Sequence, residues 1–381
     1  MTLRAIESTA AFSVYGGGST ERERSIRRMC DIGQEIGETD QVLRGLVGLS
    51  SLYVVRGECT RGFELTARCL ELADPSRDAD LLVDIHWNKA LLANFAGDLQ
   101  RALATLKDGL AYAERMNRSF SPEGFLFNAS FKVNLANACQ LLGRIADSAR
   151  FSEEALQQAR DSGHLFSICF ALTSPICALW RREPEMVRVH TEEAIALAEK
   201  YGFATFLAVG RVYHGWALAE LGQVNAGVEE IKDAVASFRR IRGFPREQYA
   251  IALLADGYAR QGRSREALSM LNAALCHIEQ TGQKAEQAEM LRLKGEIVLM
   301  RDSSALPEAE SCFRAALGVA RAQEARWWEL RTSVSLARLL RDTDRRDEAR
   351  GILAEIYGWF TKGLELPDLK EARALLNELG A

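Results

Sequence analysis

The chain has 381 residues and a formal charge of −4, with 48% apolar and 26% charged residues, as in ordinary folded proteins. This balance gives no strongly basic field to attract nucleic acid or an anionic membrane surface. No apolar stretch reaches the roughly 18 residues that cross a membrane, and the N-terminus lacks the pattern of a signal peptide. We therefore expect a cytoplasmic protein that binds neither nucleic acid nor membrane.

From the N-terminus onward, apolar helical segments alternate with turns about 40 residues apart. After a first turn in residues 16–18, turns are expected at Gly57, Gly97, Gly143, Arg182, Gly222, Gly262, near Ser303 and at Asp344. The predicted hairpins lie at about residues 1–37, 43–73, 80–116, 128–162, 167–201, 207–241, 247–281, 287–323 and 328–360, followed by a capping helix at 367–379. No alternating β-branched pattern predicts a strand.

Two places depart from the regular repeat. The hairpin at 167–201 has Pro175 at the small position of its first helix and Glu183–Pro184 at its turn. The step between the turns at Gly97 and Gly143 is longer than the others and contains Arg118–Gly124, which predicts an extended loop.

Residues 250–280 show the repeat most clearly. Ala267 and Ala274 lie two helical turns apart on one face of the second helix, where small side chains allow the first helix to approach closely. The seam between these helices is expected to contain Leu254, Tyr258 and Leu271. This arrangement is typical of tetratricopeptide (TPR) repeats. We predict an all-α, right-handed superhelical solenoid of about nine TPR-like hairpins, forming a single domain over residues 1–381.

The C-terminal stretch 309–379 contains Trp328–Arg331, Ser335–Arg338 and Tyr357–Phe360. It resembles the C-terminal repeat region of bacterial multidomain signalling ATPases, in which a class III adenylate or guanylate cyclase or a winged-helix domain precedes a P-loop ATPase and TPR repeats. Residues 15–58 resemble the start of that region. No GxxxxGK[ST] motif occurs in this sequence. The resemblance therefore implies a sensor arm that binds a partner or effector and controls attached modules.

The groove is the main functional candidate, because in TPR proteins the first helix of each hairpin lines the concave face. The corresponding positions are Trp87, Asn88, Asn134, Asn137, Gln140, Thr173, Tyr213, Trp216, Asp256, Arg260, Arg292, Glu296 and Arg338. The N-terminal members are aromatic and amide-rich, whereas the C-terminal members are charged. Such groups suit a peptide, a protein partner or a small effector, although each could instead solvate the wall or pack against a neighbouring hairpin.

Catalytic and metal-binding patterns are weak. His190 and Glu193 stand at i, i+3 without an HExxH motif, and the eight cysteines are scattered, as expected of small buried residues. Trp327–Trp328 could form a ligand platform, but packing is favoured. We expect no enzyme activity, no cofactor and no metal. The alternative function is a detached regulatory part of a cyclase-type or ATPase signalling enzyme whose catalytic domains lie elsewhere. The sequence leaves the oligomeric state open.

Overall fold

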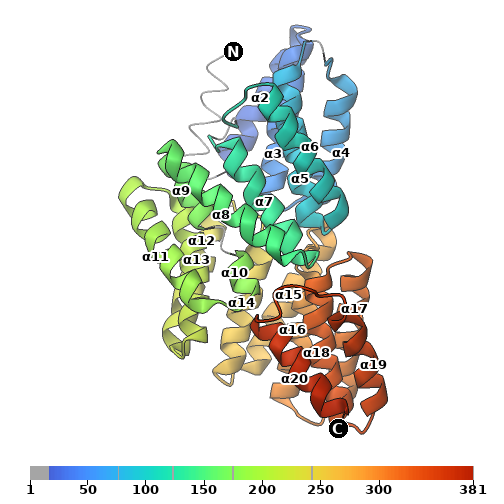
Figure 1. Ribbon diagram of the computed structural model, residues 1–381. Helices are drawn as coiled ribbons and strands as arrows, with labels where there is room; N and C mark the ends of the chain where they lie inside the picture. The colour runs from blue at the N-terminus through green and yellow to red at the C-terminus, as the bar shows by residue number, and fades with distance from the viewer. Residues whose placement is uncertain (1–16, 76, 122–123, 174–175, 242, 381) are drawn as a thin grey trace.

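The structure is a computed structural model that describes residues 17–75, 77–121, 124–173, 176–241 and 243–380. Helices build this part of the chain, and the only β-pairing within it is an isolated bridge between Phe120 and Leu126. Successive hairpins wind from the N-terminus at one end to the C-terminus at the other (Figure 1). The predicted all-α solenoid of TPR-like hairpins is confirmed. None of the described helices is long and apolar enough to cross a membrane.

The helices pack as successive pairs. The first helices are α3 (Thr39–Arg56), α5 (Ala79–Ala96), α7 (Phe127–Leu141), α12 (Ala204–Glu220), α14 (Glu247–Arg260), α16 (Gln287–Arg301) and α18 (Arg326–Asp342). Their partners are α4 (Cys59–Leu72), α6 (Leu99–Arg115), α8 (Ile145–Ser162), α13 (Val224–Ile241), α15 (Ser264–Thr281), α17 (Leu306–Ala322) and α19 (Arg346–Tyr357). At the ends lie α2 (Thr20–Glu35) and α20 (Pro367–Gly380).

The hairpin with the weakest repeat pattern has an interrupted first helix. It consists of α9 (Leu165–Leu172) and α10 (Ile176–Trp180), which precede α11 (Pro184–Tyr201). Pro175 lies outside the described residues, as does most of the N-terminal segment of the expected hairpin 1–37. α11 begins with proline at its first position, where the missing N–H costs no helical hydrogen bond.

The turn positions adopt the left-handed backbone that the repeat pattern suggests. The glycines at these turns have φ between 70° and 90°, which a residue without Cβ adopts at little cost. Arg182 and Asp344 occupy equivalent turns with φ of 59° each. The turn near Ser303 differs, since Asp302, the residue that follows the end of α16, is extended with φ of −154°.

Small residues in the hairpin seams allow the paired helices to touch. A Cβ atom on Gly215 would lie 2.6 Å from the carbonyl oxygen of Gly227, so these two helices meet backbone to backbone. Ala267 is fully buried between α14 and α15, together with Leu271. Seven of the eight cysteines are also buried, and all eight are free thiols.

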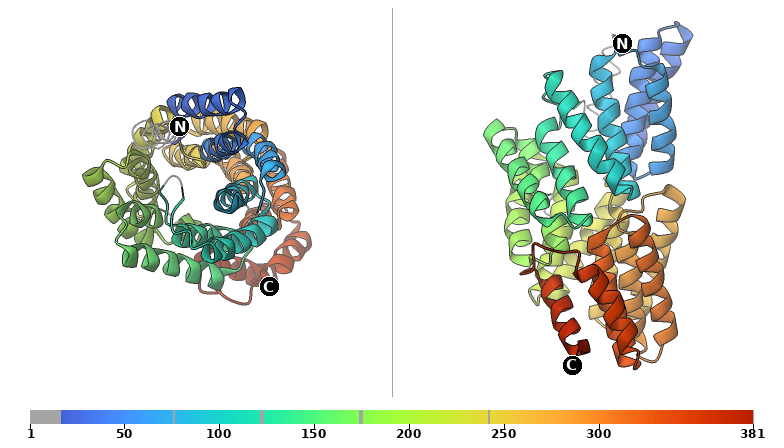
Figure 2. Two further views of the ribbon diagram at one scale, coloured as in Figure 1. Left: turned by 90° about the horizontal axis from the view of Figure 1, so that it is seen from above. Right: turned by 45° about the vertical axis from the view of Figure 1, so that its right-hand side comes forward.

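The superhelix completes a turn, so its C-terminal hairpins stack beneath its N-terminal ones. Seen from above, the helices form a ring (Figure 2). The Ala285 amide donates to the Phe95 carbonyl oxygen at 3.0 Å, and the Trp327 indole donates to the Trp180 carbonyl oxygen at 3.0 Å. These contacts between distant hairpins divide the interior of the ring.

Candidate binding site

The described residues line a larger and a smaller cavity on the inner face of the superhelix. The N-terminal cavity has a volume of about 670 Å³, and the C-terminal cavity has a volume of about 370 Å³. Two helices contribute to both. Tyr213 of α12 lines the N-terminal cavity, and Trp216, three residues later, lines the C-terminal one. On α10, Ile176 lines the N-terminal cavity and Leu179 lines the C-terminal one.

A layer of side chains from distant hairpins separates the two cavities. We call it the partition; its members are Phe95, Trp180, Arg246, Glu286 and Trp328. Trp180 and Trp328 are fully buried and pack edge to face at 5.4 Å between ring centroids. The Arg246 guanidinium lies 4.7 Å from the Phe95 ring centroid and forms a 2.7 Å ion pair with Glu286. Trp327 and Trp328 are therefore packing residues, as favoured above.

The amide-bearing wall of the N-terminal cavity comes from α5 and α7. Asn134 is satisfied within the protein, since its Oδ1 accepts from Asn94 and its Nδ2 donates to the Ser130 carbonyl oxygen. Asn88 donates from Nδ2 to the Val47 carbonyl oxygen at 3.2 Å, and Asn137 accepts at Oδ1 from the Cys177 thiol at 3.2 Å. The other amide atom of each, Asn88 Oδ1 and Asn137 Nδ2, has no partner among the described residues.

Five phenylalanines form another part of the wall of this cavity. Phe125, Phe166 and Phe206 contact one another with centroid distances from 4.8 to 6.4 Å. Phe170 and Phe203 extend the group, which we call the phenylalanine cluster. All five line the cavity, and all except Phe206 are only half-buried. The cluster leaves apolar surface facing the cavity, where a bulky apolar group could be buried.

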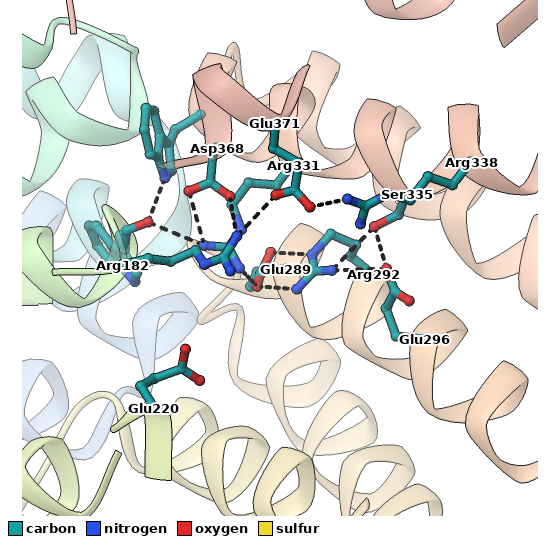
Figure 3. Close-up of polar contacts among 12 residues, drawn as sticks. Arg182, Glu220, Glu289, Arg292, Glu296, Arg331, Ser335, Arg338, Asp368 and Glu371 are labelled. Atoms are coloured by element: carbon teal, nitrogen blue, oxygen red, sulfur yellow. Dashed lines mark hydrogen bonds and ion pairs between the residues drawn. The ribbon is translucent and has the colours of Figure 1, made fainter. Parts of the chain in front are cut away.

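The C-terminal cavity is lined by charged side chains that bind one another (Figure 3). Arg292 donates from Nε and Nη2 to the two carboxylate oxygens of Glu289, each at 2.8 Å. Its Nη1 donates to Ser335 Oγ at 3.2 Å, and Ser335 donates to Glu296 at 2.6 Å. Arg331 adds a second ion pair to Glu289 at 3.1 Å. Every nitrogen of the Arg292 guanidinium thus has an acceptor.

The terminal helix α20 joins this network through Asp368 and Glu371, near its N-terminus. Glu371 forms ion pairs with Arg182, at 3.0 Å, and with Arg338. Asp368 lies 3.7 Å from Arg182 and 3.8 Å from Arg331, and its Oδ2 is buried without a hydrogen-bond partner. α20 therefore closes one side of the cavity by charge pairing (Figure 3).

Burial and charge pairing shift the carboxyl groups of this network in opposite directions. Burial alone would raise the pKa of Glu289, but Arg292 and Arg331 outweigh it and hold the pKa below its ordinary value. For Asp368, burial prevails over Arg331 and Arg182 and raises the pKa. Burial likewise raises the pKa of Asp256, against the charge of Arg260.

The residues predicted for the groove divide between the two cavities. Those lining the N-terminal cavity are Trp87, Asn88, Asn134, Asn137, Thr173 and Tyr213. Those lining the C-terminal cavity are Trp216, Asp256, Arg260, Arg292, Glu296 and Arg338. Gln140 lines neither, because it is fully buried and accepts from Arg181 Nη1 at 3.3 Å.

Sequence reasoning missed two features of the N-terminal cavity. The phenylalanine cluster was not predicted, although its members concentrate between residues 125 and 206. Arg246 was also missed, because it precedes α14 and lies outside the projected helical faces. In the described part of the chain, no three His, Cys, Asp or Glu side chains gather in a metal-binding group.

No family model matches the chain, and no curated protein matches it. Among solved structures, it is similar to a Rap protein complexed with Competence and Sporulation Factor, with a TM-score of 0.57 and 12% identity over 100% of this chain and 97% of that one. NprR in complex with its cognate peptide NprX gives 0.54 and 11%, over 99% and 98%. The Rap conjugation gene regulator of plasmid pLS20, in complex with the Phr* peptide, gives 0.52 and 11%, over 89% and 96%. These likenesses establish a shared TPR-like helical-repeat fold.

Proposed function

We propose that this chain is a non-catalytic, cytoplasmic regulatory scaffold that binds a short peptide in its N-terminal cavity. The observation that carries the proposal is the pair of unpartnered amide atoms at Asn88 and Asn137. One is an acceptor and the other is a donor. A peptide backbone offers the complementary N–H and C=O groups.

The rest of the cavity supports a ligand of this kind. Its volume of about 670 Å³ falls within the roughly 300–1,000 Å³ typical of ligand sites. The phenylalanine cluster supplies apolar area for a bulky side chain, and Trp87 stands on the amide-bearing wall. Three solved structures of the same fold are complexes, and two of them are described as containing peptides.

As a second proposal, the regulated partner is a P-loop ATPase or cyclase module on another segment or chain. The resemblance of residues 309–379 to the repeat regions of signalling ATPases supports this proposal. The test is co-expression with an ATPase encoded next to the gene, followed by size-exclusion chromatography. Independent elution of the two proteins, with and without peptide, would exclude it.

Peptide binding is tested with a pool of synthetic heptapeptides that have free termini. The full chain is mixed with the pool, separated by size exclusion, and the retained peptides are identified by mass spectrometry. We expect a subset to be retained by the wild type and about tenfold less by Asn137→Ala, which loses one buried hydrogen bond.

Lys107→Gln, on the exposed face of α6, serves as the control and should retain the same peptides as the wild type. Thermal unfolding of each variant verifies that the cavity is intact. Retention of no peptide by the wild type, or equal retention by Asn137→Ala, would contradict the proposal.

A further inference from the structure

Arg246 lies at the floor of the N-terminal cavity, and some N–H donors of its guanidinium have no hydrogen-bond acceptor. Only 7% of the residue is exposed, and it lines the cavity where the partition closes it. Its Nε donates to Glu286 Oε1 at 2.7 Å, and its face lies over the Phe95 ring. Glu286 is also buried, so this ion pair is largely shielded from solvent.

The remaining nitrogens of Arg246 have no acceptor. Nη2 is buried without a hydrogen-bond partner, and within the described ranges Nε is the guanidinium atom that has one. Arg292 in the C-terminal cavity provides the comparison, because all three of its nitrogens donate to carboxylate or hydroxyl oxygens. Buried charged donors are usually hydrogen-bonded, so unused donors on a side chain that lines a cavity point to a missing acceptor.

Arg246 is close to the groups already assigned to ligand binding. Burial raises the pKa of the Cys177 thiol, and the positive charges of Arg181 and Arg246 oppose that rise. The same thiol donates to Asn137 Oδ1 at 3.2 Å. The cavity therefore combines a cationic floor, an amide wall and the phenylalanine cluster in one enclosed space.

We infer that the peptide bound in this cavity places a carboxylate against the free edge of Arg246 and a bulky apolar side chain against the phenylalanine cluster. This inference rests on the proposed function. A planar guanidinium matches a carboxylate with two parallel hydrogen bonds, which neutral carbonyl groups cannot reproduce. Glu286 accepts from Nε of the same guanidinium and competes with the ligand for its charge.

A peptide offers a carboxylate at its C-terminus or on an aspartate or glutamate side chain. Three heptapeptide pools separate these sources: free C-termini without acidic side chains, amidated termini with one central glutamate, and amidated termini without acidic residues. The full chain should retain the first or the second pool about tenfold more than the third, as expected for a charge-assisted hydrogen bond. The better-retained pool identifies the source of the carboxylate.

Substitutions of Arg246 and Glu286 test whether Arg246 binds the carboxylate of the peptide. Arg246→Gln alone would leave Glu286 buried without its partner, so the double variant Arg246→Gln/Glu286→Gln replaces both charges and should bind all pools alike. Glu286→Gln removes the carboxylate that competes for Arg246. It should raise retention of whichever carboxylate-bearing pool the wild type retains better by about tenfold. Arg265→Gln is the control, because Arg265 is exposed on α15, lines neither cavity and should leave the retention of all three pools unchanged.

The outcomes separate the two proposals. Equal retention of all three pools, still sensitive to Asn137→Ala, would overturn the carboxylate inference and leave peptide binding intact. A preference for acidic peptides that survives in the double variant, or is weakened by Glu286→Gln, would also overturn it. Retention of no pool by the wild type would contradict the proposed function, and the inference with it.

Discussion

The two cavities show opposite ways of placing polar groups on a concave wall. In the C-terminal cavity, Arg292 and Glu289 satisfy each other, and the surrounding charges form ion pairs in one network, in which Arg331 Nε and Asp368 Oδ2 are buried without a hydrogen bond. In the N-terminal cavity, Asn88, Asn137 and Arg246 each retain a polar atom without a partner in the described structure. Polar character alone therefore does not mark a binding wall. The useful distinction is whether the fold already uses the polar atoms.

The largest expected effect is on stability and falls in the C-terminal cavity. Glu289→Gln leaves Arg292 and Arg331 buried without their shared carboxylate, which should cost about 3–5 kcal/mol at pH 7. Because the pKa of Glu289 is lowered from its ordinary value of 4.5, its contribution is present above that value and lost as pH falls through the folded pKa. Urea unfolding at several pH values should show the difference from wild type shrinking on acidification.

Glu266→Gln, on the exposed face of α15, is the matched control and should unfold like the wild type at pH 7. A Glu289→Gln variant as stable as the control would show that the C-terminal network does not stabilise the fold. The contrast between the two cavities would then be wrong.

A smaller effect is expected on binding, and it separates the cavities directly. Asn137→Ala should weaken peptide affinity by about 1–3 kcal/mol with little change in thermal unfolding, because its free amide edge faces the N-terminal cavity. Trp216→Ala alters the C-terminal cavity and should leave affinity unchanged, measured by calorimetry at a temperature where the variant is folded. Equal losses from both would mean that one ligand spans the partition.

Asp368→Asn should change stability by no more than about 1 kcal/mol, because its carboxylate is buried without good hydrogen bonds. Its raised pKa gives the opposite sign of pH dependence from Glu289. The stability that protonated Asp368 contributes to the folded state is fully present below the ordinary pKa of 3.8. It is lost as pH rises through the raised pKa of the folded protein. The variant should therefore gain stability relative to wild type as pH increases, and a slope parallel to that of Glu289→Gln would contradict this assignment.

The smallest effect is expected on the outer surface. Glu64 on α4 and Lys107 on α6 are both exposed and lie outside both cavities. Glu64→Gln and Lys107→Gln should leave peptide affinity and unfolding unchanged within experimental error, as for most surface substitutions. A loss of peptide binding from either would move the site to the convex face.

Much of the fold was predictable because its signals are local. Gly97 and Gly222 mark turns by their left-handed backbone, and Ala267 marks a seam by its size. The sequence also predicted that the inner face changes from aromatic and amide side chains to charged ones along the chain, since Asn137 and Arg292 project from first helices, but it predicted one groove and not two cavities. Which polar atoms of these side chains are hydrogen-bonded within the protein was not predictable, because the partner of Asn137 is a thiol 40 residues away on the next hairpin.

The sequence by itself determined the repeating helical hairpins, their small-residue seams and the kinds of side chain on the inner face. Only the tertiary structure decided that the superhelix stacks on itself and that a partition divides its interior. Two members of the partition are hydrogen-bonded to distant hairpins, Phe95 to Ala285 and Trp180 to Trp327. The pitch of a solenoid is the sum of small rotations accumulated over several hairpins. No local pattern specifies that sum, so the pairing of Arg246 with Glu286 and the unused edge beside it emerge only in the folded chain.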